Sequence, residues 1–318
     1  MDKKAGAKIG IFGDTGMVGA EIDKLLSAHG GVEVVYRRNS RREEGSLADC
    51  ALVFLATRDE ESMRYARAAA DADVKVVDMS GAFRIGLPEF EKWYGIKHGA
   101  PDLLQKAVYG MPALYADEIR GAGIVANPGC YPTAVILTLK PLRGLLRGEA
   151  IVFATSGNSG ARREVEIDSN EISYSYGKLH KHVPEMNKYS GFDIDFNPIV
   201  IRSVYRGINA CIRAELSDEL SQADPTRAAN AMESTIGAAY TEDDLVEIVR
   251  DTADHQFGTK DVNETNKLLI KVRVDGKYAY LNSLLDNLYK GAAGTAVENM
   301  NLMLGFPRLQ GIAVTKMG

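Results

Sequence analysis

Short apolar runs and helical stripes alternate along the first 130 residues of the chain. The apolar runs predict five strands, at Lys8–Phe12, Val32–Tyr36, Ala51–Ala56, Val74–Asp78 and Ile124–Ala126. Between them, segments such as 20–28 and 60–72 have the periodicity of helices. Strands that alternate with helices at this spacing predict βαβ units, and hence an α/β fold with a Rossmann-type, doubly wound parallel sheet.

From about residue 150 the pattern changes to strands with fewer helices between them. Residues 199–206 and 208–215 alternate like strands, 268–274 and 278–282 predict a hairpin around Asp275-Gly276, and 226–240 and 243–249 read as helices. This predicts an α+β domain for substrate and subunit contacts. A last helix, Thr295–Leu304, is expected to return to the first domain. The predicted domains are therefore 1–129 with 288–318, and 130–287.

Composition narrows the class of protein. The chain has 318 residues, of which 45% are hydrophobic and 25% charged, so we expect a globular protein with two cores. A net charge of -5 favours neither nucleic acid nor an acidic membrane as partner. The chain has no signal-peptide pattern and no apolar run of about 18 to 20 residues, so it is predicted to be cytoplasmic.

A glycine loop joins the first predicted strand to a helix. The pattern Gly13-x-x-Gly16-x-x-Gly19 in this position is typical of dinucleotide binding, because glycines let the backbone approach a pyrophosphate at the helix N-terminus. The predicted cofactor contacts in this loop are Gly13, Thr15, Gly16, Met17, Val18 and Gly19.

Basic residues follow the second predicted strand, where an NAD-selective fold has an acidic residue that holds the ribose. Arg37, Arg38 and Ser40 suit a 2′-phosphate instead, so the sequence favours NADP over NAD. The alternative is a solvated basic loop.

Cys130 follows a sharp turn, Asn127-Pro128-Gly129, and precedes a helix-like run. A thiol at a helix N-terminus has a lowered pKa and becomes a thiolate nucleophile near neutral pH. The alternative is a buried structural cysteine. Cys50, Cys130 and Cys211 lie far apart and form no CxxC pair, which argues against a disulfide scaffold and a thiolate metal site.

His180 and His182 are the candidates for an acid/base beside this thiol, and Glu185 is near enough to orient an imidazole. Two residues apart on an extended backbone, both rings would face the same way. Which ring meets the thiol stays open, with a slight preference for His182 because Glu185 is closer to it. The pair alone makes a poor zinc site, so no metal is expected.

Further polar residues stand where ligands bind in such folds. Ser80 and Arg84 follow the fourth predicted strand, whose carboxyl end faces the ligand crevice. The loop Ser156–Arg162 offers hydroxyl donors and a positive charge. A nicotinamide cofactor combined with a reactive thiol predicts acyl transfer to sulfur followed by hydride transfer, which links an activated acid to an aldehyde.

These motifs, in this order, resemble the N-acetyl-gamma-glutamyl-phosphate reductase family, relatives of the aspartate-semialdehyde dehydrogenases. The resemblance covers nearly the whole chain. It is carried by the glycine loop and by Tyr109–Pro112, Asn127–Thr133, Ser156–Gly160, His180–Glu185, Tyr205–Gly207 and Asp286–Gly294.

The resemblance implies that Cys130 attacks an acyl phosphate, that NADPH reduces the thioacyl enzyme, and that His180 or His182 moves the protons. It also implies a homodimer or homotetramer. By inference beyond the matched motifs, we assign Ser156, Gly157 and Asn287 to the cofactor, and Ser80, Arg84, Asn127 and Arg206 to the substrate.

Ala82 and Ala113 depart from the family pattern, since many members carry an acidic residue at each position. Three alternatives stay open. They are an aspartate-semialdehyde dehydrogenase, a reductase of a lysine-pathway or carrier-bound analogue, and a non-catalytic NADP-binding redox sensor.

Overall fold

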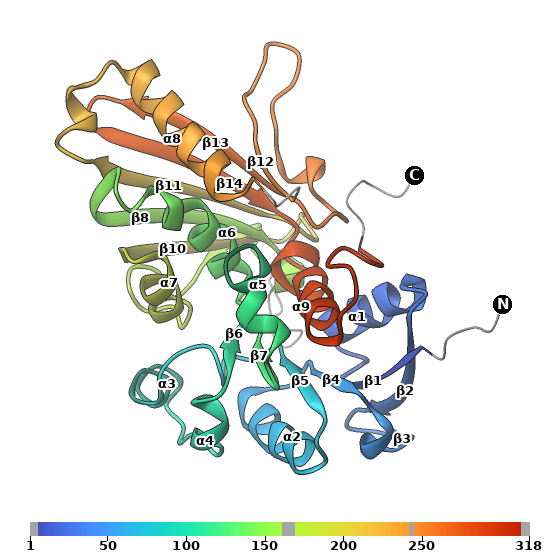
Figure 1. The fold of residues 1–318 in the computed structure, drawn as a ribbon. Coiled ribbons are helices and arrows are strands. Elements are labelled where there is room, and N and C mark those ends of the chain that lie inside the picture. The colour runs from blue at the N-terminus through green and yellow to red at the C-terminus, as the bar shows by residue number, and fades with distance from the viewer. Residues whose placement is uncertain (1–5, 161–168, 242–244, 313–318) are drawn as a thin grey trace. The chain divides into compact units, whose positions relative to one another are not determined.

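The computed structural model describes residues 6–160, 169–241 and 245–312, which divide into two compact units (Figure 1). The first unit contains residues 6–129 and 292–312, and the second contains the described part of 130–291. The ends of the predicted domains, 1–5 and 313–318, lie outside the described residues, as do 161 and 162 of the predicted glycine-serine loop.

The first unit is built on a sheet with strand order β3-β2-β1-β4-β5-β7-β6. Every neighbouring pair is parallel except β2 and β3. Its central strands are apolar and buried, as a parallel sheet covered on both faces requires. The strands are β1 Ala7–Phe12, β2 Val32–Arg38, β3 Glu43–Glu44, β4 Leu52–Leu55, β5 Lys75–Asp78, β6 Val108–Tyr109 and β7 Ile124–Ala126.

Helices connect these strands and cover the sheet. They are α1 Met17–Ala28, α2 Asp59–Asp71, α3 Leu87–Tyr94, α4 Pro101–Leu104, α5 Pro112–Arg120 and α9 Gly294–Leu304. Helix α2 begins with three acidic residues, which the positive end of the helix dipole favours. Helix α9 comes from the end of the chain and packs on α1, α5 and β5.

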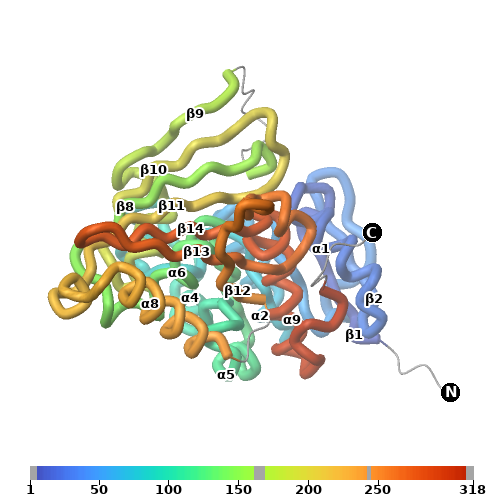
Figure 2. The backbone as a smooth tube through the Cα atoms, turned by 90° about the horizontal axis from the view of Figure 1, so that it is seen from above, coloured from blue at the N-terminus to red at the C-terminus, as the bar shows by residue number. Residues whose placement is uncertain are grey.

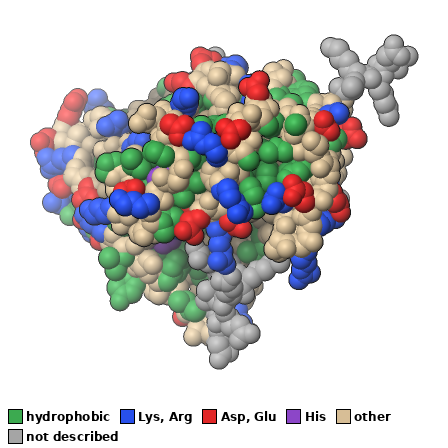
Figure 3. Space-filling model, turned by 90° about the horizontal axis from the view of Figure 1, so that it is seen from below, with side chains coloured by type: hydrophobic (Ala, Val, Ile, Leu, Met, Phe, Trp, Pro, Cys, Tyr) green, Lys and Arg blue, Asp and Glu red, His purple; other side chains and the backbone are tan. Residues whose placement is uncertain are grey.

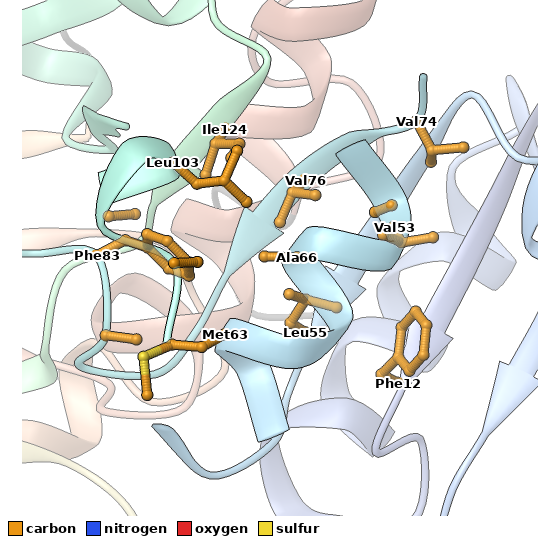
Figure 4. Close-up of a cluster of buried hydrophobic side chains, with 14 of the residues drawn as sticks. Phe12, Val53, Leu55, Met63, Ala66, Val74, Val76, Phe83, Leu103 and Ile124 are labelled. Carbon is orange, nitrogen blue, oxygen red and sulfur yellow. The ribbon is translucent and has the colours of Figure 1, made fainter. Parts of the chain in front are cut away.

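One hydrophobic cluster shows how α2 is held against the sheet (Figure 4). Met63 and Ala66 of α2 pack with Val53 and Leu55 of β4 and with Val76 of β5, and all five are at most 4% exposed. Burying such side chains contributes roughly 1.5–3 kcal/mol each for the larger ones. This packing fixes the carboxyl ends of β4 and β5, where the candidate ligand residues begin.

The second unit contains a mixed sheet with strand order β12-β13-β14-β11-β8-β10-β9, and Figure 2 shows its long strands side by side. The strands are β8 Leu146–Gly157, β9 Glu171–Ser173, β10 Asp193–Ile201, β11 Ile208–Leu216, β12 Val246–Ile248, β13 Leu268–Asp275 and β14 Tyr278–Leu285. The predicted hairpin is β13 and β14, which pair antiparallel from Leu268 with Leu285 to Asp275 with Tyr278.

Helices α6 Cys130–Leu139, α7 Val183–Ser190 and α8 Pro225–Ala239 pack on this sheet. Alternate residues of β11 are buried, including Ile208, Ala210 and Ile212. On the opposite face, Phe153, Cys211 and Asn282 stand in register across β8, β11 and β14. Phe153 is 56% exposed, so this face of the sheet is open in the single chain.

The predicted fold class is confirmed, with two local corrections. Residues 202–206, which were expected to continue a strand, follow the end of β10 at Ile201 as a turn and loop, where the chain reverses and Val204 N–H donates to Ile201 O at 3.3 Å. Residues 246–248, which were expected in a helix, form strand β12, parallel to β13. The segment is rich in β-branched residues and lies beside a strong apolar strand, and this pairing outweighs a short helical periodicity. Residues 243 and 244 of the expected helix lie outside the described residues.

No helix within the described ranges has the length and apolar character needed to span a bilayer. Figure 3 shows acidic and basic side chains interspersed over one face of the molecule, with apolar side chains between them.

Candidate active site

Cys130 is the first residue of α6, directly after β7 and the turn Asn127–Gly129. The next nine residues of the helix are buried, whereas Cys130 is only half-buried. The first turn contains no acidic residue, so the helix N-terminus keeps its preference for an anion. The site thus presents an accessible thiol where a thiolate is stabilised.

The turn before Cys130 is fixed by Asn127, which is fully buried in the first unit. Its backbone N–H donates to Asp78 O at 2.8 Å, and its carbonyl accepts from Arg84 Nε at 2.8 Å. Its side chain donates to Ala292 O at 3.3 Å and accepts from Asn299 Nδ2 at 3.0 Å. The backbone and the side-chain amide of Asn127 therefore both hold the turn, which gives the residue a positioning role.

Ser80 and Arg84 lie at the carboxyl end of β5 and are 7% exposed each. Arg84 Nη2 donates to Met79 O at 2.8 Å, so its guanidinium links the loop after β5 to the turn before Cys130. Ser80 Oγ donates to Asp78 Oδ2 at 2.8 Å. Burial raises the pKa of Asp78 to about 6, which Ser80 and the charge of Arg84 partly oppose. The structure therefore brings the predicted residues Ser80, Arg84 and Asn127 together.

The glycine loop has the backbone that a dinucleotide needs. Gly13 has a φ of +82°, and a Cβ on Gly19 would lie 2.1 Å from Gly13 O. Gly16 precedes the first residue of α1, Met17, whose helix N-terminus can receive a phosphate. The loop therefore fits a pyrophosphate. The other predicted contacts, Thr15 and Val18, lie in the turn and in the first turn of α1.

The predicted 2′-phosphate residues stand at the end of β2 and just beyond it. Arg37 pairs with Asp23 at 2.6 Å, and Arg38 pairs with Glu43 at 2.7 Å. Ser40 is exposed in the following loop. Both guanidinium groups are partly exposed and held by carboxylates at the carboxyl end of β2.

In the second unit, Asn287 ties two predicted loops together. Its Oδ1 accepts from Gly207 N at 2.7 Å, and its Nδ2 donates to Ser159 Oγ at 3.0 Å. Gly157 N donates to Gly207 O at 2.9 Å, and a Cβ on Gly157 would meet Tyr205 O at 2.4 Å. The Ser156–Gly160 loop, the Tyr205–Gly207 loop and the start of the C-terminal motif therefore converge.

Arg206 is held by the fully buried carboxylate of Asp286. Asp286 Oδ2 accepts from Arg206 Nη1 at 3.2 Å and from Glu264 N at 2.7 Å. Its Oδ1 accepts from the N–H groups of Leu288 and Tyr289, at the start of a π-helix at Tyr289–Ala293. The Arg206 side chain keeps 12% of its surface exposed. A cation held in this way can bind an anionic group with little loss of side-chain entropy.

Gly291 of this π-helix lies against Cys130. A Cβ added to Gly291 would be 2.8 Å from Cys130 Cβ and 3.2 Å from Cys130 Cα. The absence of a side chain at position 291 is therefore what lets α6 begin where it does. The C-terminal motif contributes to the thiol site through its backbone.

The two histidines lie in the turn before α7, not on an extended strand. His182 is the N-cap of the helix, with φ -81° and ψ -12°, and its ring centroid is 4.7 Å from that of His180. Both rings meet Tyr131, the residue after Cys130, at 5.9 and 6.0 Å. The structure thus brings both imidazoles to the segment that carries the thiol.

Glu185 lies in the first turn of α7 and is 1% exposed. Its carboxylate is therefore buried within the second unit, and its role in orienting an imidazole stays a prediction.

Two phenols adjoin the thiol, and the sequence pattern did not single them out. Tyr174 OH donates to Tyr131 OH at 3.5 Å. Burial raises the pKa of Tyr174 to about 12 and that of Tyr131 well above its usual range, and the charge of the nearby Cys130 thiolate adds to both shifts. Both phenols therefore stay protonated at neutral pH, as hydrogen-bond donors rather than bases.

Other missed residues are Asp78, Asp286 and Asn299, which hold the candidate ligand residues in place. Asp286 opens the C-terminal motif and could have been found from it, whereas Asn299 gave no signal beyond a polar residue in an apolar helix. Among residues 6–160, 169–241 and 245–312, no group of three or more His, Cys, Asp or Glu side chains could hold a metal ion.

Two family models match the chain. Residues 39–122 match the semialdehyde dehydrogenase NAD binding domain, and residues 130–287 match the semialdehyde dehydrogenase dimerisation domain. The chain is also similar to curated proteins along nearly its whole length. It is 35% identical over 353 residues to N-acetyl-gamma-glutamyl-phosphate reductase of Thermus thermophilus, covering 94% of this chain and 96% of the relative. It is 34% identical over 346 residues to the protein of that name from Rhodopirellula baltica, covering 96% and 98%.

Solved structures with the same fold include aspartate-semialdehyde dehydrogenases. Aspartate semialdehyde dehydrogenase II of Vibrio cholerae, complexed with ASA, has a TM-score of 0.71 at 18% identity, covering 95% of this chain and 99% of that one. The enzyme of Candida albicans, solved with NADP, has a TM-score of 0.71 at 14% identity, covering 94% and 99%. At these identities the likeness shows the fold alone.

Proposed function

Because the chain belongs to the N-acetyl-gamma-glutamyl-phosphate reductase family, within the semialdehyde dehydrogenases, we propose that it reduces N-acetyl-gamma-glutamyl phosphate to N-acetylglutamate 5-semialdehyde and phosphate in arginine biosynthesis. Family membership also makes the chain an oxidoreductase with a nicotinamide-nucleotide domain. The observation that carries the proposal is Cys130, an accessible thiol that begins a helix beside the histidine turn.

In the first step the Cys130 thiolate attacks the acyl carbon of the substrate. The C–S bond forms, the C–O bond to phosphate breaks, and phosphate leaves with the electron pair. The N-terminus of α6 stabilises the thiolate before attack. The backbone N–H at Cys130 then donates to the developing oxyanion, a contribution often worth roughly 3 kcal/mol per donor.

The glycine loop supports NADPH as the reductant. Gly13, Gly16 and Gly19 would hold the pyrophosphate at α1, while Arg37 and Arg38 would receive the 2′-phosphate. NADPH held by these residues would supply the hydride that reduces the acyl carbon. Neutral replacements of the two arginines should raise the KM for NADPH far more than that for NADH, and equal changes would remove them from the 2′-phosphate site.

His182 is our candidate for the proton transfers at the sulfur-bound carbon. Its imidazolium protonates the oxygen of the thiohemiacetal as that species forms. It then takes the same proton back when the C–S bond breaks, the aldehyde carbonyl forms and sulfur leaves as thiolate. His182 is half-buried at the N-cap of α7, whereas His180 already uses Nδ1 to accept the His182 N–H at 3.1 Å.

Arg206 is our candidate for an anionic group of the substrate. Its guanidinium is fixed by Asp286 at 3.2 Å, and the Tyr205–Gly207 loop around it is fixed by Asn287. Arg84 is more enclosed and bonds two carbonyl groups, so we propose that it acts through the turn before Cys130.

Replacement of the nucleophile tests the mechanism. Cys130→Ser should remove nearly all phosphate-dependent reduction of NADP with N-acetylglutamate 5-semialdehyde, because a serine hydroxyl is a far weaker nucleophile at neutral pH. Binding of NADPH to the variant, measured by fluorescence, should stay unchanged. Activity within about tenfold of the parent would reject a cysteine mechanism.

Assays with aspartate semialdehyde and with a lysine-pathway aldehyde in the same buffer distinguish the substrate alternatives. Turnover of either at a higher kcat/KM would replace the proposed substrate. A redox sensor would bind NADPH yet turn over none of the three.

We also propose that the chain forms a homodimer or homotetramer through the open face of its second sheet, which carries the exposed rings of Phe153 and Tyr280.

The unbridged thiols of Cys50, Cys130 and Cys211 suit a reducing compartment, so we propose that the enzyme is cytoplasmic.

A further inference from the structure

His180 is enclosed by aromatic rings from three separate parts of the second unit. Its ring centroid lies 5.9 Å from Tyr131 of α6, 5.5 Å from Tyr174 after β9, and 5.2 Å from Phe196 of β10. All three contacts are edge-on, and the residue is 8% exposed. The imidazole therefore has little freedom to rotate.

The hydrogen bond at Nδ1 determines the protonation state of this ring. The backbone N–H of His182 donates to His180 Nδ1 at 3.1 Å, so this nitrogen must offer a lone pair. The proton of the neutral ring is then on Nε2. Burial lowers the pKa of His180 to about 4, and the charge of Lys181 lowers it further. His180 is consequently neutral at neutral pH.

The same bond controls where His182 lies. The backbone N–H of His182 is held by a ring that α6 and β10 enclose, and the ring of His182 packs edge-on against it at 4.7 Å and 65°. Since His182 is the N-cap of α7, its backbone is fixed from the helix side as well. His180 thus joins the histidine turn to the helix that carries Cys130.

We propose that His180 is a positioning residue, which holds His182 through its Nδ1 lone pair and its ring face and itself transfers no proton. This inference rests on the proposed role of His182. It divides the two histidines by function, with one imidazole as the proton carrier and the other as its support.

Two amide substitutions separate this role from acid/base chemistry. His180→Asn places an amide oxygen near the position of Nδ1 and can still accept the His182 N–H, whereas His180→Gln places its amide near the position of Nε2. His180→Phe keeps the ring packing without the acceptor. Each full-length variant is assayed for kcat and KM across pH.

The His180→Asn variant should keep kcat within about fivefold of the parent and keep its pH profile, whereas the Gln and Phe variants should lose kcat by at least about tenfold with KM little changed. The reverse order, with Gln active and Asn inactive, would show that Nε2 works in the reaction and would overturn the inference. Equal activity of all three variants would also overturn it.

Two measurements need no substrate turnover. The pH dependence of Cys130 alkylation by iodoacetamide should be the same in the parent and in His180→Asn, and should change in His180→Gln. If N-acetylglutamate semialdehyde is not a substrate but the alkylation rates follow this order, the proposed function fails and the positioning role stands.

Nitrogen NMR of the parent should show His180 with Nδ1 unprotonated and no titration between pH 8 and 5. A titration near pH 6.5 would contradict the inference even if every variant failed to fold.

Discussion

His180 and His182 are two residues apart in sequence, yet their surroundings differ. Aromatic rings and a backbone N–H hold His180 neutral, whereas His182 is half-buried at a helix N-cap. A neutral buried histidine stabilises the fold only while it stays uncharged. This makes the stability of the enzyme depend on pH in a predictable direction.

The unfolded chain protonates His180 near pH 6.5, but the folded protein does so only near pH 4, because burial opposes the charge. Between these values the unfolded state binds more protons, so the stability due to His180 is complete above pH 6.5 and is lost as the pH falls towards 4. The loss amounts to about 3 kcal/mol in total.

Urea unfolding of the parent and of His180→Asn from pH 7 to 4 measures this effect. As the pH falls from 7 to 4, the unfolding free energy of the parent should decrease relative to that of His180→Asn. Asp78, whose pKa is raised to about 6 by burial, changes stability in the opposite direction but is common to both proteins. A difference that stays constant with pH would show that His180 titrates normally in the folded state.

The start of α6 is packed against the π-helix at Tyr289–Ala293. The two segments are about 160 residues apart in sequence, and they meet because Gly291 has no side chain. Any Cβ at this position must displace Cys130, since backbone atoms of the site are only 3.2 Å away.

Gly291→Ala should therefore lower kcat/KM by at least about tenfold, because a shift of the nucleophile by a fraction of an ångström spoils its alignment. Gly144→Ala is the matched control, since nothing lies within 4 Å of a Cβ there. Steady-state kinetics and thermal unfolding of both variants give the comparison. A Gly291→Ala enzyme with full activity would mean that the thiol site tolerates displacement of Cys130.

The sequence predicted the elements well wherever burial alone decides structure. The strands that lead to Asp78 and to Cys130 are short, mainly apolar segments, the first interrupted only by Lys75, and polar or glycine-containing turns follow them, so their ends could be read directly. Strand β12 was misread as a helix because its strand character depends on pairing with β13, which no local pattern contains.

The site was predictable where chemistry follows a motif and not where it depends on long-range contacts. Cys130 and the histidine pair came from motifs. The enclosure of His180 could not be predicted, because it depends on Tyr174 and Phe196 from distant parts of the chain.

Ala82, which departs from the family pattern, is fully buried in the hydrophobic cluster of the first unit. An apolar side chain suits these surroundings, where an unpaired charge would be destabilising.

At the scale of the whole molecule, the second sheet is covered by helices on one face and open on the other. The open face carries Phe153, 56% exposed, and Tyr280, 42% exposed, in the part of the chain that matches a dimerisation domain. Aromatic side chains of this kind are enriched in subunit interfaces.

Phe153→Glu combined with Tyr280→Glu should shift the enzyme towards monomers, because each change occurs twice at a two-fold interface and buries a charge. Sedimentation velocity at several concentrations measures the effect. Leu87→Glu is the control, since Leu87 is also an exposed apolar residue, at 36%, but belongs to the first unit. An unchanged oligomer in the double variant would exclude this face as the interface.

We propose that Cys130 forms a covalent bond with the acyl group of the substrate. Intact-protein mass spectrometry after mixing the enzyme with N-acetyl-gamma-glutamyl phosphate, without NADPH, detects this bond. We expect a mass increase of one N-acetylglutamyl group, located on the peptide of Cys130, absent from Cys130→Ala and lost on addition of NADPH. An enzyme that reduces this substrate yet never carries the adduct under rapid quenching would rule out the Cys130 intermediate.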